Sequence, residues 1–544
     1  MSTGSTIQLS QAAAARRSIA VAMGKATRRA VQTFGKGGGT AIPGRVMLAI
    51  DPGALTGLAD QLARGTVLVT GSNGKGTTCR MLAQIMRDAG LRPLLNTEGS
   101  DQRSGLATTM VAQAGYAGRL PADASAIGLF EVDEGSFPEI MRQVRSPAAI
   151  VFTNIFRDQQ DRYLEPAFVT TMIERALRHL PSGTTLVLNA DDPRVAFLAP
   201  GLKNPRLYFG MADSVRRRDG ADPTSDFPRC PRCGADLSYD CFFYAHLGHY
   251  RCTSCGLERP EPQVSVTELG LTGPSSTRLE LTTPAGSTVL EIPLPGFYNA
   301  YNALAAVATA TCCELPHRSF PAIEQVTAAA LRMERVTVAG HDVYLALAKN
   351  ATGYTEVLRA VLCDDQPRRM LLGLNDCPGK QPDTSWIWDV DFDGLTGLVP
   401  APVVTGNRAA ELAVRLKYAG WLGDDGRPAI KAEPDPVRAF LAALDQTPAG
   451  EPLWIIATSI VLMRIRRWLY QQGHVRQIWQ DADHYRANAA RPPAGGRPLV
   501  RRPVTRLRLP EPESALSTPV LSEATLHDTV ISKNARRRPG KASR

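Results

Sequence analysis

No run of apolar residues in this sequence reaches the roughly 18 that a membrane-spanning helix requires. The first residues also lack the continuous apolar stretch of a secretory signal. Both absences predict a cytoplasmic protein, and disulfide bonds are rare in that compartment. The ten cysteines therefore need another explanation, and two Cys-x-x-Cys pairs among them have a spacing typical of metal ligands.

Acidic residues are absent from residues 1–40, which carry six basic residues. Residues 485–544 carry thirteen basic and four acidic residues, so the rest of the chain has a net charge of −5 although the whole chain has +10. The basic ends therefore do not indicate a nucleic-acid-binding body, and we expect no nucleic-acid partner. They predict a basic helix with a glycine-rich linker over residues 1–46 and a disordered tail over 485–544. The helix can lie on an anionic membrane surface or pack against the body.

The segment Val67–Arg80, VLVTGSNGKGTTCR, has the pattern of a phosphate-binding loop. An apolar strand enters a glycine-rich turn, and a helical pattern follows it. Glycine lets the backbone approach an anion closely, N–H groups at the helix start point at the anion, and Lys75 adds a positive charge. The residues expected to bind the phosphates are Gly71, Ser72, Asn73, Gly74, Lys75, Gly76, Thr77 and Thr78.

A second apolar strand pattern, IGLFEVDE at Ile127–Glu134, ends in acidic residues. A carboxylate at a strand end opposite a phosphate loop is a suitable Mg²⁺ ligand. Acids on a solvated strand end are the alternative, and the phosphate loop upstream favours the metal-binding interpretation.

Four cysteines have the spacing C-x₂-C-x₁₈-C-x₂-C. Two such pairs place four thiolates in a tetrahedron around one Zn²⁺, and because no coordination position stays open, the site is expected to be structural. Residues of about 226–260 are therefore predicted to form an inserted zinc ribbon, with Cys241 unligated and with His246 and His249 at its surface. The predicted zinc ligands are Cys230, Cys233, Cys252 and Cys255.

The phosphate loop, in its short TGxNGK form, resembles the ATP loop of the Mur ligase and folylpolyglutamate synthase superfamily. Because Gly76 directly follows Lys75, the resemblance implies Thr77 as the Mg²⁺-binding hydroxyl, and Glu131 takes the position of the metal-binding acid. Gln159 stands where Mur ligases carry a histidine that binds a second Mg²⁺. A neutral amide is a weaker ligand than imidazole, which puts that second site in question.

Two further motifs carry the same resemblance. Leu294–Ala310 is similar to the LPGxxNxxNxxAA segment, whose asparagines lie near the nucleotide, and Asn299 and Asn302 take these positions. Leu331–Val336 resembles the GRxE hinge that opens the third domain of the Mur ligases. This similarity implies that Arg332 faces ATP.

Residues 337–480 alternate strand and helix patterns, which indicates a parallel sheet. Three segments, Leu374–Asp393, Thr405–Gly420 and Ala457–Leu469, resemble the C-terminal domain of the MurT family, the Mur-ligase-like subunits of lipid II isoglutaminyl synthase. Lys349 stands where ordinary Mur ligases have a histidine and fits the same resemblance.

The resemblance implies an amidating ligase. ATP would convert the α-carboxylate of D-glutamate in the lipid II stem peptide to an acyl phosphate, and ammonia would then give D-isoglutamine. No cysteine has the setting of a glutaminase nucleophile, so we expect ammonia from a GatD-type glutamine amidotransferase, with lipid II bound at the membrane surface. The MurT family is described as lending an aspartate to its partner's Cys–His site. The candidate catalytic residues are Asp383 first, then Asp376, Asp389 and Lys349.

The predicted architecture is multidomain α/β. A Mur-ligase-type P-loop central domain over residues 47–320 carries the inserted zinc ribbon, and a Rossmann-like C-terminal domain follows over 331–480. Two other functions stay open: an amino-acid ligase of the Mur or folylpolyglutamate kind, and a catalytically inactive scaffold that binds precursors. Gly76, Gln159 and Leu331 favour the scaffold, whereas the intact loop lysine argues against it.

Overall fold

The computed structural model describes most of the chain. The described residues are 3–34, 40–96, 100–157, 165–212, 215, 224–226, 228–364, 366, 368–376, 383–395, 399–421 and 430–476. All of them belong to the first of two compact units, Met1–Leu507. The tail predicted over 485–544 lies outside the described residues. None of the described helices is both long and apolar enough to cross a membrane.

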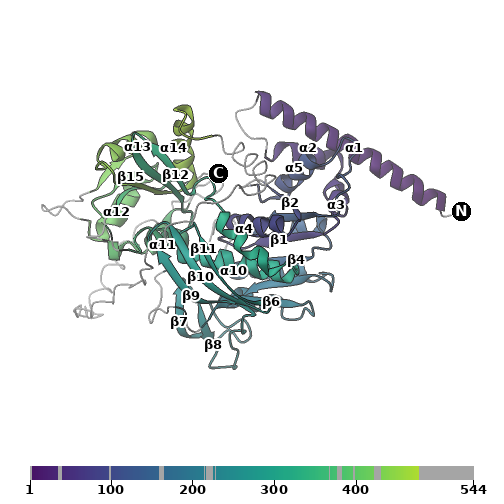
Figure 1. Cartoon of the computed structure of the whole chain (residues 1–544), viewed down its shortest axis with the longest axis horizontal. Coiled ribbons are helices and arrows are strands. Elements are labelled where there is room, and N and C mark those ends of the chain that lie inside the picture. Colours follow the sequence, from purple (N-terminus) through teal and green to yellow (C-terminus); the bar gives the residue numbers. More distant parts are fainter. Residues whose placement is uncertain are drawn as a thin grey trace, which may run out of the picture. The chain divides into compact units, whose positions relative to one another are not determined.

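This unit contains two large β-sheets with helices packed around them, and the larger sheet has nine strands (Figure 1). Its order is β11-β10-β9-β6-β5-β4-β1-β3-β2. Neighbouring strands from β2 to β9 are parallel, and β9, β10 and β11 form an antiparallel edge. The strands are β1 (Thr66–Thr70), β2 (Arg92–Leu95), β3 (Ala126–Glu131), β4 (Ala149–Phe152), β5 (Thr185–Asn189), β6 (Arg206–Met211), β9 (Val264–Thr272), β10 (Ser276–Thr283) and β11 (Gly286–Ile292).

Helices cover both faces of this sheet. Val67 and Val69 of β1 belong to one apolar core and Leu68 to the other, because successive side chains of a strand point to opposite faces. The first core is closed by α4 (Lys75–Asp88), α10 (Phe297–Cys312) and η2 (His317–Gln325). The second is closed by α2 (Ile42–Ile50), α3 (Ala54–Ala59), α5 (Arg103–Gln113), α6 (Phe137–Gln143), α8 (Pro166–Leu177) and α9 (Pro193–Ala196). The short helix η1 (Glu134–Ser136) directly precedes α6.

The long N-terminal helix α1 (Thr3–Phe34) packs on the body with one of its faces. Ala20, Val21 and Gly24 are buried there. Ile19 and Met23 are 58 % and 48 % exposed on the other face. The helix therefore packs against the body, as one of the two predictions had it, and still leaves apolar side chains in solvent.

The predicted insertion contains the hairpin of β7 (Ser238–Tyr244) and β8 (Leu247–Arg251). The cysteine pairs flank its open end, since Cys233 precedes β7 and Cys252 follows β8. At the other end, Ala245 and His246 form a fully buried turn. The prediction that His246 and His249 lie at the surface is wrong, because the hairpin tip is packed into the core of the central domain.

The second large sheet has six strands in the order β12-β13-β17-β14-β15-β16. All neighbouring pairs are parallel except β12 with β13. Its strands are β12 (Arg332–Val338), β13 (His341–Leu347), β14 (Arg369–Gly373), β15 (Val403–Thr405), β16 (Lys431–Glu433) and β17 (Leu453–Ala457). The helical segments around it are α11 (Ala351–Val361), η3 (Ser385–Asp389), η4 (Asp393–Leu395), α12 (Ala409–Tyr418), α13 (Pro436–Asp445) and α14 (Ser459–Gln471).

Candidate active site

The phosphate loop connects β1 to α4, and two of its glycines press against polar side chains. A Cβ on Gly74, where φ is 88°, would lie 2.1 Å from Asn302 Oδ1. A Cβ on Gly71, where φ is 132°, would lie 2.2 Å from Thr153 Oγ1. No side chain fits at either position, and glycine also adopts these backbone angles without strain. The glycines therefore allow the loop to close tightly against α10 and the segment after β4.

Gly76 allows a third close approach, that of the Glu131 carboxylate. A Cβ on Gly76 would lie 3.0 Å from Glu131 Oε2. Asn96 fixes the backbone of Glu131, accepting from its N–H at 2.9 Å and donating to its carbonyl at 2.9 Å. Glu131, the predicted Mg²⁺ ligand at the end of β3, thus faces Gly76 in the first turn of α4. The next residue in that turn is the other predicted ligand, Thr77.

Lys75 is held inside the loop by a buried ion pair. Its Nζ donates to Glu134 Oε2 at 3.1 Å and to the Gly71 carbonyl at 2.5 Å. Burial alone would lower the pKa of Lys75, but the carboxylates of Glu134, Asp101 and Glu131 outweigh burial and raise it above its usual value. Lys75 is therefore a permanent positive charge in the phosphate loop.

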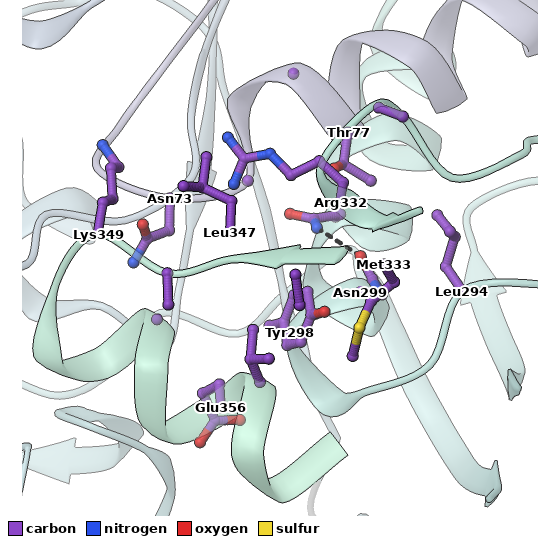
Figure 2. A pocket seen from close by; sticks show the side chains of 18 of the residues that line it. Asn73, Thr77, Leu294, Tyr298, Asn299, Arg332, Met333, Leu347, Lys349 and Glu356 are labelled. Atoms are coloured by element: carbon purple, nitrogen blue, oxygen red, sulfur yellow. Dashed lines mark hydrogen bonds between the residues drawn. The ribbon is translucent and has the colours of Figure 1, made fainter. Parts of the chain in front are cut away.

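One pocket opens beside the loop, and Figure 2 shows the side chains around it. Asn73 and Thr77 of the loop line it together with Asn299 and Asn302 of α10. Asn302 Nδ2 donates to Asn299 Oδ1 at 3.0 Å, and Asn299 Nδ2 donates to the Pro295 carbonyl at 2.7 Å. The two predicted asparagines are thus buried and fixed in orientation at the wall of the pocket.

The C-terminal domain supplies another part of the lining. Arg332 at the start of β12 and Lys349 after β13 both line the pocket. Asn350 caps α11 by accepting from the Gly353 N–H at 2.7 Å, and its Nδ2 donates to Asn73 Oδ1 at 3.3 Å. Sequence reasoning missed Asn350, although an asparagine directly before a helical pattern signals a helix cap.

The hinge before β12 has an unusual backbone. Leu331 and Met333 have φ values of 64° and 60°, a region that disfavours residues with a Cβ by roughly 1–2 kcal/mol each. Glu334 stabilises this conformation, since its Oε2 accepts from the Leu331 N–H at 2.9 Å and lies 3.0 Å from Arg466 Nε. Leucine thus adopts the left-handed conformation that the glycine of the similar hinge motif adopts readily.

The candidate aspartates of the C-terminal domain lie away from this pocket, because none of them lines it. Asp383 is exposed and accepts from the N–H and hydroxyl of Ser385 at 2.8 and 3.0 Å. Asp376 forms an ion pair with Arg408 at 2.7 Å. Asp389 is exposed at the end of η3. The structure therefore brings Lys349, but not the aspartates, to the phosphate loop.

The four cysteines of the insertion form a compact cluster. Their Sγ atoms all lie within 4.8 Å of one another. The Cys230–Cys255 and Cys233–Cys252 Sγ distances are both 3.5 Å. A tetrahedral site with Zn–S bonds of about 2.3 Å requires sulfur separations of about 3.8 Å, so the set fits zinc. Among the described residues, only these four His, Cys, Asp or Glu side chains converge in this way.

The segment after β4 fixes the phosphate loop from the side. The N–H groups of Ser72 and Asn73 donate to the carbonyl and Oδ1 of Asn154 at 2.9 and 2.8 Å. The Phe156 N–H donates to Ser72 Oγ at 3.0 Å. Sequence reasoning assigned these residues no role, although Thr153 and Asn154 directly follow the apolar strand β4. Gln159, the predicted ligand for a second Mg²⁺, lies outside the described residues.

Comparisons with known proteins identify the class. A family model for the Mur ligase middle domain matches residues 69–223, and one for the MurT ligase C-terminal domain matches residues 347–459. The solved structure of a pseudomurein peptide ligase type C from Methanothermus fervidus aligns with a TM-score of 0.56 at 20 % identity, covering 75 % of this chain and 78 % of that one. The predicted α/β fold is confirmed, and the protein is an ATP-dependent ligase of the Mur type.

Two relatives narrow the class further. Both are named lipid II isoglutaminyl synthase (glutamine-hydrolyzing) subunit MurT. The one from Streptococcus pneumoniae R6 is 32 % identical over 453 residues, which is 81 % of this chain and 94 % of the relative. The one from Staphylococcus aureus N315 is 30 % identical over 403 residues, 74 % of this chain and 87 % of the relative. The chain belongs to the MurT family, and the predicted resemblance is confirmed.

Proposed function

We propose that this chain is the ligase subunit of a lipid II isoglutaminyl synthase, which amidates the α-carboxylate of D-glutamate in the stem peptide. The observation that carries the proposal is the shared pocket, in which the phosphate loop faces Arg332 and Lys349 in a chain of the MurT family. The working parts would be a central domain over residues 47–320 and a C-terminal domain over residues 331–480.

The reaction would have two steps. A carboxylate oxygen attacks the γ-phosphorus of ATP, which gives an acyl phosphate and ADP. Ammonia then attacks the acyl carbon, inorganic phosphate leaves with the bonding electrons, and the nitrogen loses a proton. The first step brings two anions together, so the positive charges of Lys75, Arg332 and Lys349 would lower its barrier. A closed pocket would also keep water from the acyl phosphate.

The chain would bind two kinds of metal ion, Mg²⁺ for the chemistry and Zn²⁺ for structure. Thr77 and Glu131 would hold Mg²⁺, which when bound neutralises charge on the phosphates. Gln159 stays the proposed ligand of a second Mg²⁺. The four-cysteine cluster would hold a structural Zn²⁺, because sulfur ligands fill all four positions.

Ammonia would come from a GatD-type glutamine amidotransferase bound to the C-terminal domain. Trp388 and Tyr418 are 45 % and 70 % exposed there, with ring centroids 5.8 Å apart. Large exposed aromatic side chains are enriched at protein interfaces. Trp388 directly precedes Asp389 and follows Asp383 closely in the chain. We therefore place the partner on this face, with Asp383 orienting the partner's catalytic histidine.

As a cytoplasmic protein, the chain would bind lipid II at the inner face of the membrane. The exposed Ile19 and Met23 of α1, together with the exposed Arg16 and Arg29 of the same helix, support contact with anionic headgroups. Co-sedimentation with vesicles of phosphatidylglycerol tests this placement. We expect binding by the full chain and its loss in the Ile19→Ser, Met23→Ser double variant.

The central experiment measures the product mass. The chain, co-purified with a GatD-type amidotransferase, is incubated with lipid II, ATP, Mg²⁺ and glutamine. Replacement of a carboxyl OH by NH₂ lowers the mass of lipid II by about one unit, and Lys75→Ala should abolish this change. A larger gain that matches an added amino acid would instead establish an amino-acid ligase. No mass change with stable co-purification would favour the inactive scaffold.

A further inference from the structure

The tip of the β7–β8 hairpin holds a buried histidine between two carboxylates. His246 Nδ1 lies 2.8 Å from Asp226 Oδ1, and His246 Nε2 lies 3.2 Å from Asp192 Oδ1. The side chains of His246 and Asp192 are fully buried, and that of Asp226 is 5 % exposed. Because a carboxylate oxygen lies close to each ring nitrogen, the two carboxylates favour the imidazolium cation, in which both nitrogens carry a proton.

Residues of this charged cluster form hydrogen bonds with the backbone of Ile155. Asp192 Oδ2 accepts from the Ile155 N–H at 2.8 Å. Arg194 Nη1 donates to the Ile155 carbonyl at 3.1 Å and to Asp226 Oδ2 at 2.7 Å. The two carboxylates that hold His246 are therefore the same groups that fix Ile155 in place, one directly and one through Arg194.

From Ile155 the contacts reach the phosphate loop. The next residue, Phe156, donates its N–H to Ser72 Oγ at 3.0 Å. The Phe156 ring packs edge-on against His246, with centroids 5.0 Å apart, and lies 5.8 Å from the Tyr244 ring. Tyr244 itself lines the pocket together with Asn73. The hairpin tip thus touches the site both through Phe156 and directly.

We propose that the zinc-bearing insertion positions the phosphate loop of the ligase: charged His246 holds the segment Thr153–Phe156, which in turn holds Ser72 and Asn73 in the nucleotide-binding conformation. His246 is a positioning residue, because it acts through Phe156 and Asp192. The hairpin strands have seven and five residues, which span roughly 23 and 17 Å, so the cysteine cluster orders the far end of the hairpin while the tip acts on the site. The inference rests on the proposed ATP-dependent function.

The test removes the charge of His246 and leaves the hairpin otherwise intact. His246→Gln keeps a side chain that can donate to one carboxylate and loses the cation. Asp240→Asn is the matched control on the same hairpin, since Asp240 pairs with Arg251 at 3.3 Å and both side chains are about half exposed. Each full-length variant is measured well below its melting temperature for zinc content, for the Kd of Mg·ADP, and for hydrogen exchange at Ser72 and Asn73.

We expect His246→Gln to keep one zinc per chain, to weaken Mg·ADP binding at least about tenfold, and to speed exchange of the two loop amides by a similar factor. Asp240→Asn should match the wild type in all three measurements. Wild-type Kd and wild-type exchange at Ser72 and Asn73 in a folded His246→Gln protein would overturn the inference, because a merely stabilising histidine would change only the melting temperature.

A second variant covers a failure of His246→Gln to fold. Phe156→Leu keeps the ion cluster and an apolar side chain but removes the ring contacts with His246 and Tyr244. We expect weaker Mg·ADP binding and faster exchange at Ser72, and unchanged values would refute the coupling. Hydrogen exchange needs no nucleotide, so it tests the inference even if the wild-type protein were to bind no Mg·ADP, an outcome that would refute only the proposed function.

Discussion

The phosphate loop and the region of the C-terminal domain that carries Asp383 and Asp389 differ in how firmly their functional side chains are held. At the loop, Lys75 is buried and paired with Glu134, and two loop glycines admit the side chains of Asn302 and Glu131. On the other face, Asp383 and Asp389 are exposed, and Asp383 only caps its own turn. A side chain that is fixed by burial and partners is ready to act, whereas an exposed one still has to be positioned by something else.

This difference indicates how the work would be divided. The ligase side has its charges and its pocket within one chain. Among the described residues, none of the three aspartates belongs to a cluster of three or more His, Cys, Asp or Glu side chains, and in the proposed function the partner subunit would supply the cysteine and histidine. The variants below test whether the phosphate loop and the aspartates have different roles.

Loss of the loop lysine should have the largest effect. Lys75→Ala removes a buried cation from the place where charge develops on the transferred phosphoryl group. We expect a loss of about 10³-fold in ATP-dependent amidation, with glutamine and with ammonium salts alike as nitrogen source. Lys431→Ala, at an exposed lysine of β16, is the control and should be neutral. Substantial amidation by Lys75→Ala would mean that the loop is not the phosphate site.

Substitution of Asp383 should affect only one of the two nitrogen sources. Asp383→Asn is expected to lower glutamine-dependent amidation by about 10²-fold or more and to leave ammonia-dependent amidation unchanged, because an aspartate that orients the partner's histidine has no part in ligation. Parallel rate assays of the complex with glutamine and with ammonium chloride measure this. Asp376→Asn and Asp389→Asn serve as comparisons, and if either of them alone gives the selective loss, the role moves to that residue.

The buried cation at the hairpin tip should make stability depend on alkaline pH. Burial alone would lower the pKa of His246, but Asp226 and then Asp192 raise it to about 9. Because the pKa is higher in the folded than in the unfolded state, the stabilisation is complete below about pH 6.5 and is lost as pH rises through about 9. The difference of about 2.5 pKa units corresponds to about 3 kcal/mol.

Denaturant unfolding between these pH values measures this effect. The wild type should lose about 3 kcal/mol, and His246→Gln should lose little. Two other titratable groups near the ring do not interfere: against the effect of burial, His246 and Arg194 lower the pKa of Asp226, and burial raises the pKa of Tyr239. Equal pH dependence in both proteins would mean that His246 is neutral in the folded chain.

Local motifs were predictable from the sequence, and contacts between distant segments were not. The phosphate loop, the cysteine pairs and the asparagines of α10 each depend on residues close together in the chain. The contact of Asn350 with Asn73 joins residues 277 positions apart, and no local pattern signals it. The surface prediction for His246 was wrong for the same reason, since a histidine between two metal-binding pairs gives no sign that Asp192 and Asp226 will enclose it.

The smallest expected effect concerns Gly76, where sequence and structure give different reasons for a glycine. In the sequence, Gly76 stands directly after Lys75, where the usual loop has a hydroxyl residue that binds Mg²⁺. In the structure, the Glu131 carboxylate lies 3.0 Å from where a Cβ of residue 76 would be. Gly76→Ala should stabilise the first turn of α4 by up to about 1 kcal/mol, because alanine favours helix. It should also displace Glu131 by a few tenths of an ångström.

A displaced carboxylate should raise the Mg²⁺ concentration for half-maximal activity about threefold to tenfold while the melting temperature rises or stays constant. Mg²⁺ titration of ATP hydrolysis and thermal melts on one preparation measure both. Gly183→Ala, where a Cβ meets nothing within 4 Å, should change neither. An unchanged Mg²⁺ requirement in Gly76→Ala would remove Glu131 from the metal site, and the loop would then be no better organised for its metal than the C-terminal aspartates are for their partner.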